Sequence, residues 1–543
     1  MRVLGIEGTA WAASAALHDT ETNGTVIETD AYLPDSGGIH PREAAEHMRE
    51  TVPEVVASVL DHARETRDGE GVPIDAVAFS RGPGLGPCLR VVGSAARALA
   101  GTLDVPLVGV NHMVAHLEIG RHRSGFTDPI CLNASGANAH VLGYRNGRYR
   151  VLGETLDTGV GNAIDKFTRH LGWSHPGGPK VEERARTGAY TELPYVVKGM
   201  DFSFSGIMSA AKEAVDDGEP VEDVCFSLQE HVFAMLTEVA ERALSLTGTD
   251  ELVLGGGVGQ NDRLRGMLDG MCEARGADFF APEPRFLRDN AGMIAVLGAK
   301  MAAAGDTLAI ADSAVDPEFR PDEVAVTWRG GATDGSTPSD GEFDERQGAE
   351  AVVSLDPGAG RVTKRRLSKG YRHPDLDERL RASRTRSEAR LTRDARVAGV
   401  PTPLVLDVDP VEATLRFQYV GAHDLRADVT EPRVRDVAAH LARCHAAGLV
   451  HGDPTTRNVR VAEGDDDRTY LIDFGLGYYT DTPEDFAMDL HVLGQALDGT
   501  ADDADSLRET VVDAYRGTAA GTSLDAGAVL GQLGAIEGRG RYQ

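Results

Sequence analysis

Two histidines stand four residues apart in the stretch NHMVAHLEIG, residues 111–120. On a helix, His112 and His116 would share one face, and their imidazole nitrogens could bind one metal ion. A zinc protease of the H-E-x-x-H type needs a glutamate beside the first histidine as general base, and Met113 stands there instead. The pattern therefore favours a metal site without protease chemistry, or a pair of structural histidines.

A third ligand could come from Asp289 in the stretch RDNAGMIAVLGAK, since two histidines are too few to hold an ion. The alternative is a structural role, in which Asp289 or Asn290 caps a helix that begins at Ala291. The residue types alone leave both interpretations open.

The strongest local signal lies in VHGDPTTRNVR, residues 450–460, and YLIDFGLG, residues 470–477. Asp453 and Asn458 have the spacing of a kinase catalytic loop, and Asp473 begins a D-F-G motif. In this arrangement Asp453 accepts the proton of a hydroxyl group, while Asn458 and Asp473 hold Mg²⁺. Upstream, Lys364 would bind the phosphates of ATP and Glu388 would pair with it. A pseudokinase is the alternative, but the complete set of residues argues against it.

The predicted kinase is reduced. In QGAEAVV, where a glycine-rich loop would cover the nucleotide, only one glycine remains, so the ATP contacts there would fall on Gly348, Ala349 and Glu350. Gly452 replaces the usual arginine of the catalytic loop, and no A-P-E motif follows. ATP hydrolysis or autophosphorylation is therefore an alternative to phosphorylation of a protein substrate.

The elements that position these residues alternate between strands and helices. Residues 74–80 and 105–110 predict short buried strands, and residues 46–63 predict a helix with a kink or break at Pro53. Residues 130–154 predict a pair of hairpins, and the first half of this stretch resembles residues 2–17. This predicts two halves built alike, although chance similarity of two short hairpins is the alternative. Three glycine-rich loops that each open a helix favour a nucleotide site; they are residues 81–101, 173–183 and 252–265.

Length and composition set the frame. The chain has 543 residues, a length that predicts two or three domains. Its formal charge is −30 and Arg far exceeds Lys, which is typical of a protein from a high-salt cytoplasm. An acidic surface for a basic partner is the alternative. Residues 330–341 read as a flexible linker. The five cysteines are scattered, which favours a reducing cytosol, and no apolar run suggests a membrane span.

Residues 361–396 are densely basic and would be either a solvated helix surface or a phosphate-contacting patch, which the tail 538–543 could extend.

Eight motifs together resemble the universal tRNA threonylcarbamoyltransferase family over residues 1–325: GGIHPREAAEH, RGPGLGPCLRVVG, NHMVAHLEIG, DKFTRHLG, PGGP, DFSFSG, GGGVGQN and DNAGMIA. The resemblance implies an α/β, actin/hexokinase-like two-lobed ATPase fold. It also implies transfer of threonylcarbamoyl from threonylcarbamoyl-adenylate to N6 of the adenosine next to the anticodon, in tRNAs that read codons beginning with A.

The same resemblance implies the site. His112, His116 and Asp289 would hold a metal, usually Fe²⁺ and otherwise Zn²⁺. Two further sets would bind the substrate: Asn133, Ala134, Ser135, Gly136 and Ala137 beside the metal, and Asp165, Gly178, Glu182 and Asn261 at the ribose and base of the adenylate. The family usually has a tyrosine ligand where Asn133 stands, so Asn133 is a doubtful ligand. His140 also departs from the family pattern and would be an extra ligand or structural.

Residues 345–543 resemble the small RIO-like kinase of the KEOPS complex, an α+β protein-kinase-like domain. The predicted order is a transferase domain at 1–325, a linker at 326–344 and an atypical Ser/Thr kinase at 345–543. ATP, Mg²⁺, tRNA and the other small KEOPS subunits would be ligands or partners, and the location would be cytoplasmic. The rival functions are an actin-fold small-molecule kinase controlled by its own kinase domain and a non-catalytic tRNA-binding scaffold.

Overall fold

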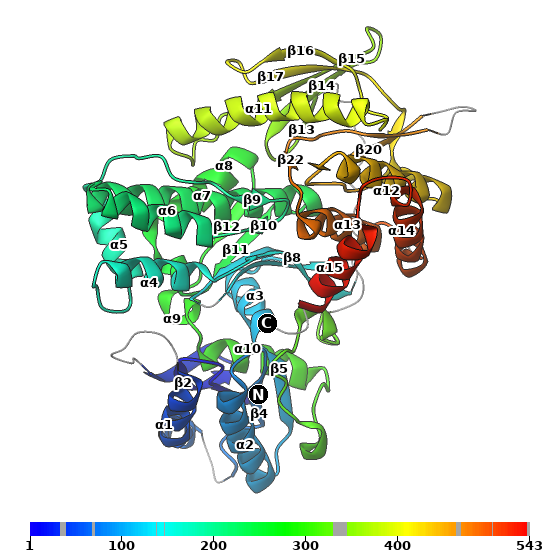
Figure 1. Cartoon of the computed structure of the whole chain (residues 1–543). Coiled ribbons are helices and arrows are strands. Elements are labelled where there is room, and N and C mark those ends of the chain that lie inside the picture. Colours follow the sequence, from blue (N-terminus) through cyan, green and yellow to red (C-terminus); the bar gives the residue numbers. More distant parts are fainter. Residues whose placement is uncertain are drawn as a thin grey trace. The chain divides into compact units, whose positions relative to one another are not determined.

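The computed structural model describes residues 1–32, 40–67, 71–136, 138–145, 147–329, 345–462, 468–501 and 503–539. The chain divides into two compact units, Met1–Ser339 and Asp340–Gln543, each described by itself below (Figure 1). The predicted linker lies mostly outside the described residues. Within those residues, no helix combines the length and the apolar character needed to cross a membrane.

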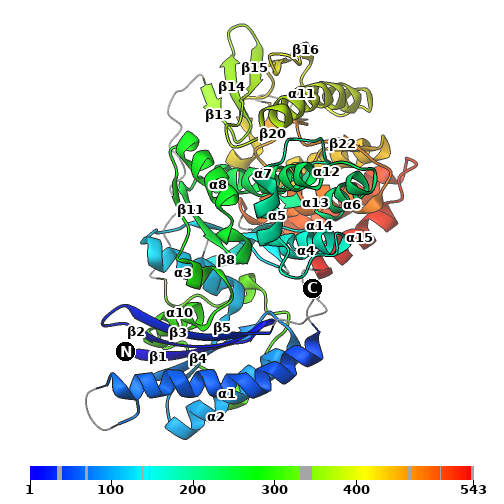
Figure 2. The ribbon, with the colours of Figure 1, turned by 90° about the vertical axis from the view of Figure 1, so that its left-hand side faces the viewer.

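The first unit opens with a five-stranded sheet in the order β3-β2-β1-β4-β5. β1 pairs antiparallel with β2 and parallel with β4. Its strands are β1 (Arg2–Glu7), β2 (Ala12–Asp19), β3 (Gly24–Ala31), β4 (Ala76–Gly82) and β5 (Leu107–Asn111). Helices α1 (Pro41–Glu65) and α2 (Gly86–Leu103) cover one face, and α3 (His112–Ser124) and α10 (Ala291–Ala303) cover the other (Figure 2). Both faces are buried, which explains the nearly continuous apolar runs that predicted β4 and β5.

Helix α1 runs unbroken through Pro53, so the predicted break is wrong. Proline inside a helix removes one backbone hydrogen bond and costs about 3 kcal/mol. The helix continues because its buried face packs against the sheet, with Val52, Val55, Val56 and Val59 all buried.

A second five-stranded sheet in the order β12-β11-β6-β7-β8 repeats this connectivity. Its strands are β6 (Ile130–Ala134), β7 (Ala139–Arg145), β8 (Arg148–Glu154), β11 (Glu251–Gly255) and β12 (Asp278–Phe280). Three antiparallel strands are followed by two parallel ones in each half. The predicted likeness of the two halves is therefore confirmed. Helices stand between β8 and β11, namely α4 (Val160–His170), α5 (Gly178–Ala185), α6 (Ser205–Asp216) and α7 (Val221–Thr247).

Helices α3 and α10 are equivalent elements of the two halves and pack against each other. Each begins behind an asparagine cap: the side chain of Asn111 accepts a hydrogen bond from the Val114 N–H, and that of Asn290 accepts one from Met293. The repeat therefore brings two helix N-termini, one from each half, into contact. The predicted helix start at Ala291 is correct.

A buried ion cluster fastens these two helices to the second sheet. Glu118 of α3 is fully buried, accepts a hydrogen bond of 2.7 Å from the Tyr149 hydroxyl and lies 2.8 Å from Lys300 Nζ of α10. Arg121 lies 2.9 Å and Arg329 lies 3.3 Å from the same carboxylate. Burial opposes its ionisation, but Lys300 and Arg121 hold the pKa of Glu118 at about 2.

Replacing Glu118 by Gln is expected to lower the unfolding free energy of the first unit by about 3–5 kcal/mol, because three cations lose their shared carboxylate. The contribution of Glu118 is complete above the ordinary carboxyl pKa of 4.5 and falls as the pH drops towards about 2. Calorimetry of the full chain at several pH values measures both effects. The control is Glu46→Gln on the exposed side of α1, and an unchanged transition in the Glu118 variant would contradict the assignment.

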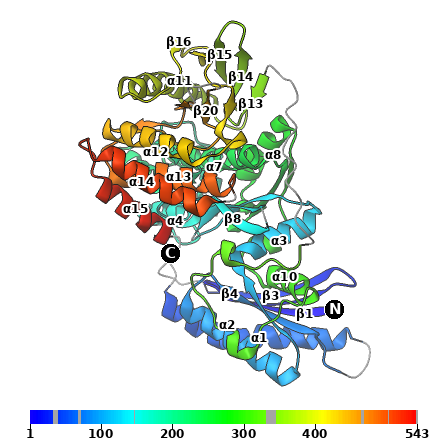
Figure 3. The same cartoon turned by 90° about the vertical axis from the view of Figure 1, so that its right-hand side faces the viewer.

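The second unit joins an antiparallel sheet to a bundle of helices. The sheet has the order β13-β14-β15-β17-β16, with β13 (Glu345–Gln347), β14 (Ala351–Asp356), β15 (Arg361–Arg366), β16 (Val405–Asp409) and β17 (Thr414–Gln418). Helix α11 (Pro374–Val397) lies beside it. Helices α12 (Glu431–Ala446), α13 (Pro483–Asp498), α14 (Ala504–Ala519) and α15 (Ala526–Arg539) pack together (Figure 3). Short strands complete this part: β18 (His423–Asp424), β19 (Leu449–Val450), β20 (Val459–Val461), β21 (Thr469–Leu471) and β22 (Tyr478–Tyr479).

The basic segment 361–396 forms β15 and α11, and much of its charge is used inside this unit. Arg366, Arg372, Arg381 and Arg384 all pair with carboxylates of the same unit. Arg386 and Arg390 are exposed. Part of the segment is therefore a structural network, and the exposed arginines remain either a solvated surface or a phosphate-contacting patch, as predicted. The tail 540–543 lies outside the described residues.

Candidate functional sites

The structure brings His112, His116 and Asp289 together at the paired N-termini of α3 and α10. His112 Nε2 lies 3.4 Å and His116 Nε2 lies 3.3 Å from Asp289 Oδ1. The three candidate ligand atoms lie within 4.8 Å of one another. Asn290, not Asp289, caps α10, so the Asp289 carboxylate is available to this cluster. Two imidazoles and one carboxylate on one side of an ion suit iron or zinc and leave coordination positions open.

Two further side chains, Glu7 and Trp11, hold the cluster in place, and neither role was predicted from the sequence. Glu7 is fully buried at the end of β1, and its Oε2 lies 3.2 Å from Nδ1 of His112. Trp11 Nε1 donates a hydrogen bond of 3.0 Å to the second oxygen of Asp289. A charged residue at the end of the apolar strand RVLGIE was the available signal. Such outer partners orient metal ligands and fix their tautomers.

The electrostatics of the cluster follow from these contacts. Burial disfavours protonation, yet the carboxylates of Glu7 and Asp289 raise the pKa of His112 to about 10. Burial likewise opposes ionisation of Asp289, but His112 and His116 hold the pKa of this carboxyl well below its ordinary value. His112 and Asp289 thus favour each other's charged forms.

Three buried polar atoms beside the triad have no hydrogen-bond partner: Nδ1 of His116, Oδ1 of Asn133 and Nδ1 of His140. Asn133 of β6 pairs with His140 of β7, and its Nδ2 lies 3.5 Å from His140 Nε2. Burial, aided by the nearby His116, lowers the pKa of His140 to about 3, so this imidazole is neutral. Orphaned buried polar groups are rare in folded proteins, and three of them on the triad residue His116 and the paired residues Asn133 and His140 indicate a site that receives a further group.

A glycine keeps this space open. At Gly256, which follows β11, φ is +84°, and a Cβ would lie 2.7 Å from Oδ1 of Asn133 and 2.2 Å from the carbonyl oxygen of Ala134. A larger residue would therefore push against the segment that carries Asn133.

The predicted substrate segment forms the turn between β6 and β7. Ser135 closes the turn through hydrogen bonds with Asn138, and the carbonyls of Ser135 and Gly136 accept from the first turn of α4. Asn133 and Ala134 are buried in β6. Ala137 lies outside the described residues.

The predicted adenylate-binding residues lie on two connected pairs of elements. On α4, Asp165 accepts a hydrogen bond of 2.7 Å from the Gly177 N–H, directly before Gly178 opens α5. On α5, Glu182 accepts one of 3.2 Å from Asp262, directly after Asn261. Asn261 caps helix α8 (Asp262–Arg275), as its place near a helix start predicted. The carboxylates and the glycine-rich turns thus lie on neighbouring elements of one unit.

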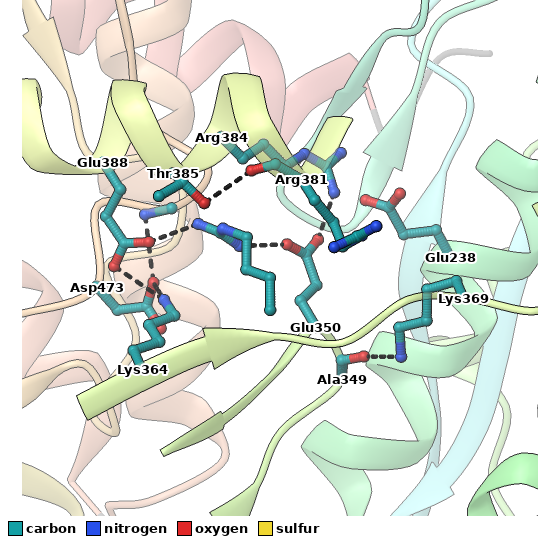
Figure 4. Close-up of polar contacts among 12 residues, drawn as sticks. Glu238, Ala349, Glu350, Lys364, Lys369, Arg381, Arg384, Thr385, Glu388 and Asp473 are labelled. Atoms are coloured by element: carbon teal, nitrogen blue, oxygen red, sulfur yellow. Dashed lines mark hydrogen bonds and ion pairs between the residues drawn. The ribbon is translucent and has the colours of Figure 1, made fainter. Parts of the chain in front are cut away.

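In the second unit, the predicted phosphate-binding lysine meets its predicted partner. Lys364 Nζ of β15 lies 2.9 Å from Glu388 of α11 and 2.6 Å from Asp473 (Figure 4). Burial opposes ionisation of Asp473, but Lys364 holds the pKa of this carboxyl below its ordinary value. Burial raises the pKa of Glu388, although Lys364 and Arg366 oppose this shift. Two carboxyl groups are therefore positioned around one ammonium group.

The segment that stands for the glycine-rich loop is tied to this network. Glu350 pairs with Arg366 at 2.9 Å and with Arg384 at 2.7 Å, and the Ala349 carbonyl accepts a hydrogen bond from Lys369 (Figure 4). Gly348 N–H bonds the carbonyl of Ala351 at 2.9 Å. The Glu350 carboxylate is thus engaged by two guanidinium groups.

The buried carboxylate of Asp489 binds the backbone of the predicted catalytic loop. Asn458 Nδ2 donates to Asp453 Oδ2 at 2.8 Å, which brings together two of the predicted residues. Asp489 of α13 is almost fully buried and accepts hydrogen bonds from the backbone N–H groups of His451 and Gly452 at 2.7 and 2.8 Å. The role of Asp489 was not predicted from the sequence. It could have been suspected because an acidic residue lies inside the apolar face of EDFAMDLHVLGQAL.

The sequence of the chain matches those of known proteins. The model of the tRNA N6-adenosine threonylcarbamoyltransferase family matches residues 22–296, and that of the phosphotransferase enzyme family matches residues 389–525. A Halobacterium salinarum protein called a probable bifunctional tRNA threonylcarbamoyladenosine biosynthesis protein is 70% identical over 100% of this chain and 99% of its own length. The chain belongs to this bifunctional family.

Two other relatives carry the same description. The Haloarcula marismortui protein is 68% identical over 100% of both chains, and the Methanospirillum hungatei protein is 50% identical over 99% of each. The chain joins an actin-like transferase domain to a kinase-like phosphotransferase domain. Neither rival function, the small-molecule kinase or the non-catalytic scaffold, is favoured by these matches.

Proposed function

We propose that the first unit transfers the threonylcarbamoyl group of threonylcarbamoyl-adenylate to N6 of the adenosine next to the anticodon, in tRNAs that read codons beginning with A. The observation that carries this proposal is the triad of His112, His116 and Asp289. The same unit also holds the set of carboxylates and glycine turns. Together these features support a cation site and a nucleotide-binding surface within one unit.

The donor set supports Fe²⁺ as the ion, with Zn²⁺ as the alternative. When bound, the ion supplies a Lewis acid that polarises a carbonyl oxygen. Glu7 binds Nδ1 of His112, so Nε2 would be the nitrogen that holds the ion, and Trp11 binds Oδ2 of Asp289, so Oδ1 would be the oxygen that holds it. Asp165 and Glu182 offer carboxylate oxygens to the ribose hydroxyls, and Asn261 and Gly178 complete that surface.

We assign Asn133 as a further ligand through its unpartnered Oδ1, with His140 as the residue that holds its amide. Replacing Asn133 by Ala is expected to weaken metal binding about 10-fold to 100-fold, the range seen when groups around a metal site are removed. Asn133→Asp keeps an oxygen at a similar reach and restores binding. Competition with a chelator under anaerobic conditions measures the affinity, and equal affinity in the Ala variant and the wild type would show that Asn133 is not a ligand.

The second unit uses ATP and Mg²⁺. Asn458 and Asp473 would hold the ion, Lys364 the phosphates, and Asp453 would accept the proton of the attacking hydroxyl or water. Helix α13 begins shortly after the D-F-G motif, which leaves little chain for binding a protein substrate. We therefore propose ATP hydrolysis or autophosphorylation, in support of the transferase and of other small KEOPS subunits.

Reconstitution tests the proposal. The full chain, tRNA, threonylcarbamoyl-adenylate and partner subunits are mixed, and the nucleosides are analysed by mass spectrometry. Threonylcarbamoyladenosine is expected. A small-molecule kinase or a scaffold would form none, so its absence under these conditions would contradict the proposal.

A further inference from the structure

A positively charged hollow lies between α4 and α6 of the first unit, on a chain whose formal charge is −30. The two helices pack against each other (Figure 1). The hollow has a volume of about 280 Å³ and is lined by Lys166, Arg169 and His170 of α4 and Lys212 of α6. His170 is fixed by Asp216, whose Oδ1 lies 2.8 Å from its Nε2.

Lysine is rare in this chain, and its placement is informative. The sequence has seven lysines. Lys180, Lys300, Lys364 and Lys369 make hydrogen bonds or ion pairs within the protein, and Lys198 also has a partner. In the part of the chain that the structure describes, Lys166 and Lys212 have none, and both line the hollow. These two ammonium groups are therefore free to bind an external anion.

The hollow is connected to the candidate reaction centre through α4. The first turn of this helix bonds the β6–β7 turn: Gly161 N–H donates to Ser135 O at 3.2 Å and Asn162 N–H to Gly136 O at 2.9 Å. Residues 166–170 follow four to eight positions later, which is about 6–12 Å along the helix at 1.5 Å per residue. Along a stacked nucleic-acid strand that distance spans about two to four nucleotides at 3.4 Å each.

We propose that the α4–α6 hollow binds the phosphate backbone of the tRNA, two to four nucleotides from the adenosine that is modified. The inference rests on the proposed function and names the surface on which the RNA would bind. An acidic protein repels a polyanion as a whole, so the RNA must be held where the local charge is reversed. In a high-salt cytoplasm, charges act over only a few ångströms, so direct contact with unpaired cations is required.

The test measures tRNA binding by the full chain at a series of KCl concentrations, starting at the lowest one at which the wild type keeps its circular dichroism spectrum. The double variant Lys166→Gln/Lys212→Gln is expected to bind tRNA more weakly. Its slope of log K against log salt should be smaller by about 1.4–1.8, since each phosphate contact contributes about 0.7 to 0.9. In the modification assay its KM for tRNA should rise while kcat stays unchanged.

The matched control is Arg42→Gln/Arg49→Gln on α1, which removes the same charge at exposed positions of the same unit, where the guanidinium groups already pair with Glu46 and Glu50. It should keep the wild-type slope and KM. A wild-type slope in the lysine variant, or a raised KM for threonylcarbamoyl-adenylate in place of tRNA, would overturn the inference. Failure of the proposed function would give a different result, because the wild-type protein would then bind tRNA but form no modified adenosine.

Discussion

Replacing His116 by Ala is expected to slow formation of threonylcarbamoyladenosine by about 1,000-fold or more, because the loss of one ligand removes several kcal/mol of transition-state stabilisation at the carbonyl. His116 is 1% exposed, and its Nε2 lies 3.3 Å from Asp289. Only one imidazole, one carboxylate and the amide oxygen assigned to Asn133 would then remain to hold the ion. Single-turnover modification of tRNA measures the rate, and metal content measured on the same sample should fall with it.

His122→Ala is the matched control, since His122 lies on the same helix but bonds Asn23 at 2.7 Å, away from the triad. It should modify tRNA at close to the wild-type rate. ATP use by the second unit should be unchanged in both variants, because its residues form a separate network. If the His116 variant kept wild-type modification, the role assigned to the metal would be wrong.

Replacing Asp453 by Asn is expected to reduce ATP turnover by about 100-fold to 10,000-fold, the usual contribution of a general base. The carboxylate is already oriented by Asn458 at 2.8 Å, and the loop that carries it is fixed by Asp489. An amide at this position keeps the shape but cannot take the proton of the attacking group. Release of phosphate and labelling of the chain by ATP measure hydrolysis and autophosphorylation separately.

The exposed Asp436→Asn on α12 is the control for this variant and should leave ATP turnover as in the wild type. Threonylcarbamoyladenosine formed in the first turnover should also persist in the Asp453 variant, since the transfer chemistry belongs to the other unit. Wild-type ATP turnover by the Asp453 variant would assign the proton transfer to another group.

The elements that could be predicted are those whose signal is local in the sequence. The four-residue spacing of His112 and His116 places both on one face of α3, and the hairpin patterns predicted β6, β7 and β8. The kinase motifs predicted that Lys364 would meet Glu388, because each lies on an element with a fixed place in that fold.

The residues that were missed act across long sequence distances. Trp11 meets Asp289 only because the N-termini of two equivalent helices come together, which depends on how the halves pack. Glu7 meets His112 because β1 and the strand β5 that precedes α3 lie in one sheet, which the sequence order alone does not reveal. Asp289 itself could be placed only through the family resemblance. The ion pairs of the basic segment could not be predicted for a related reason, since Glu350 meets Arg366 and Arg384 only when β14, β15 and α11 are assembled.

The most direct test of the central claim is metal reconstitution. Protein purified anaerobically is stripped with a chelator, reloaded with increasing Fe²⁺, and assayed for both bound metal and threonylcarbamoyladenosine. The account predicts one ion bound per wild-type chain, modification that rises in proportion to it, and neither in the His116 variant. Full modification by the stripped wild-type protein would contradict the claim that a cation held by His112, His116 and Asp289 activates the transferred group.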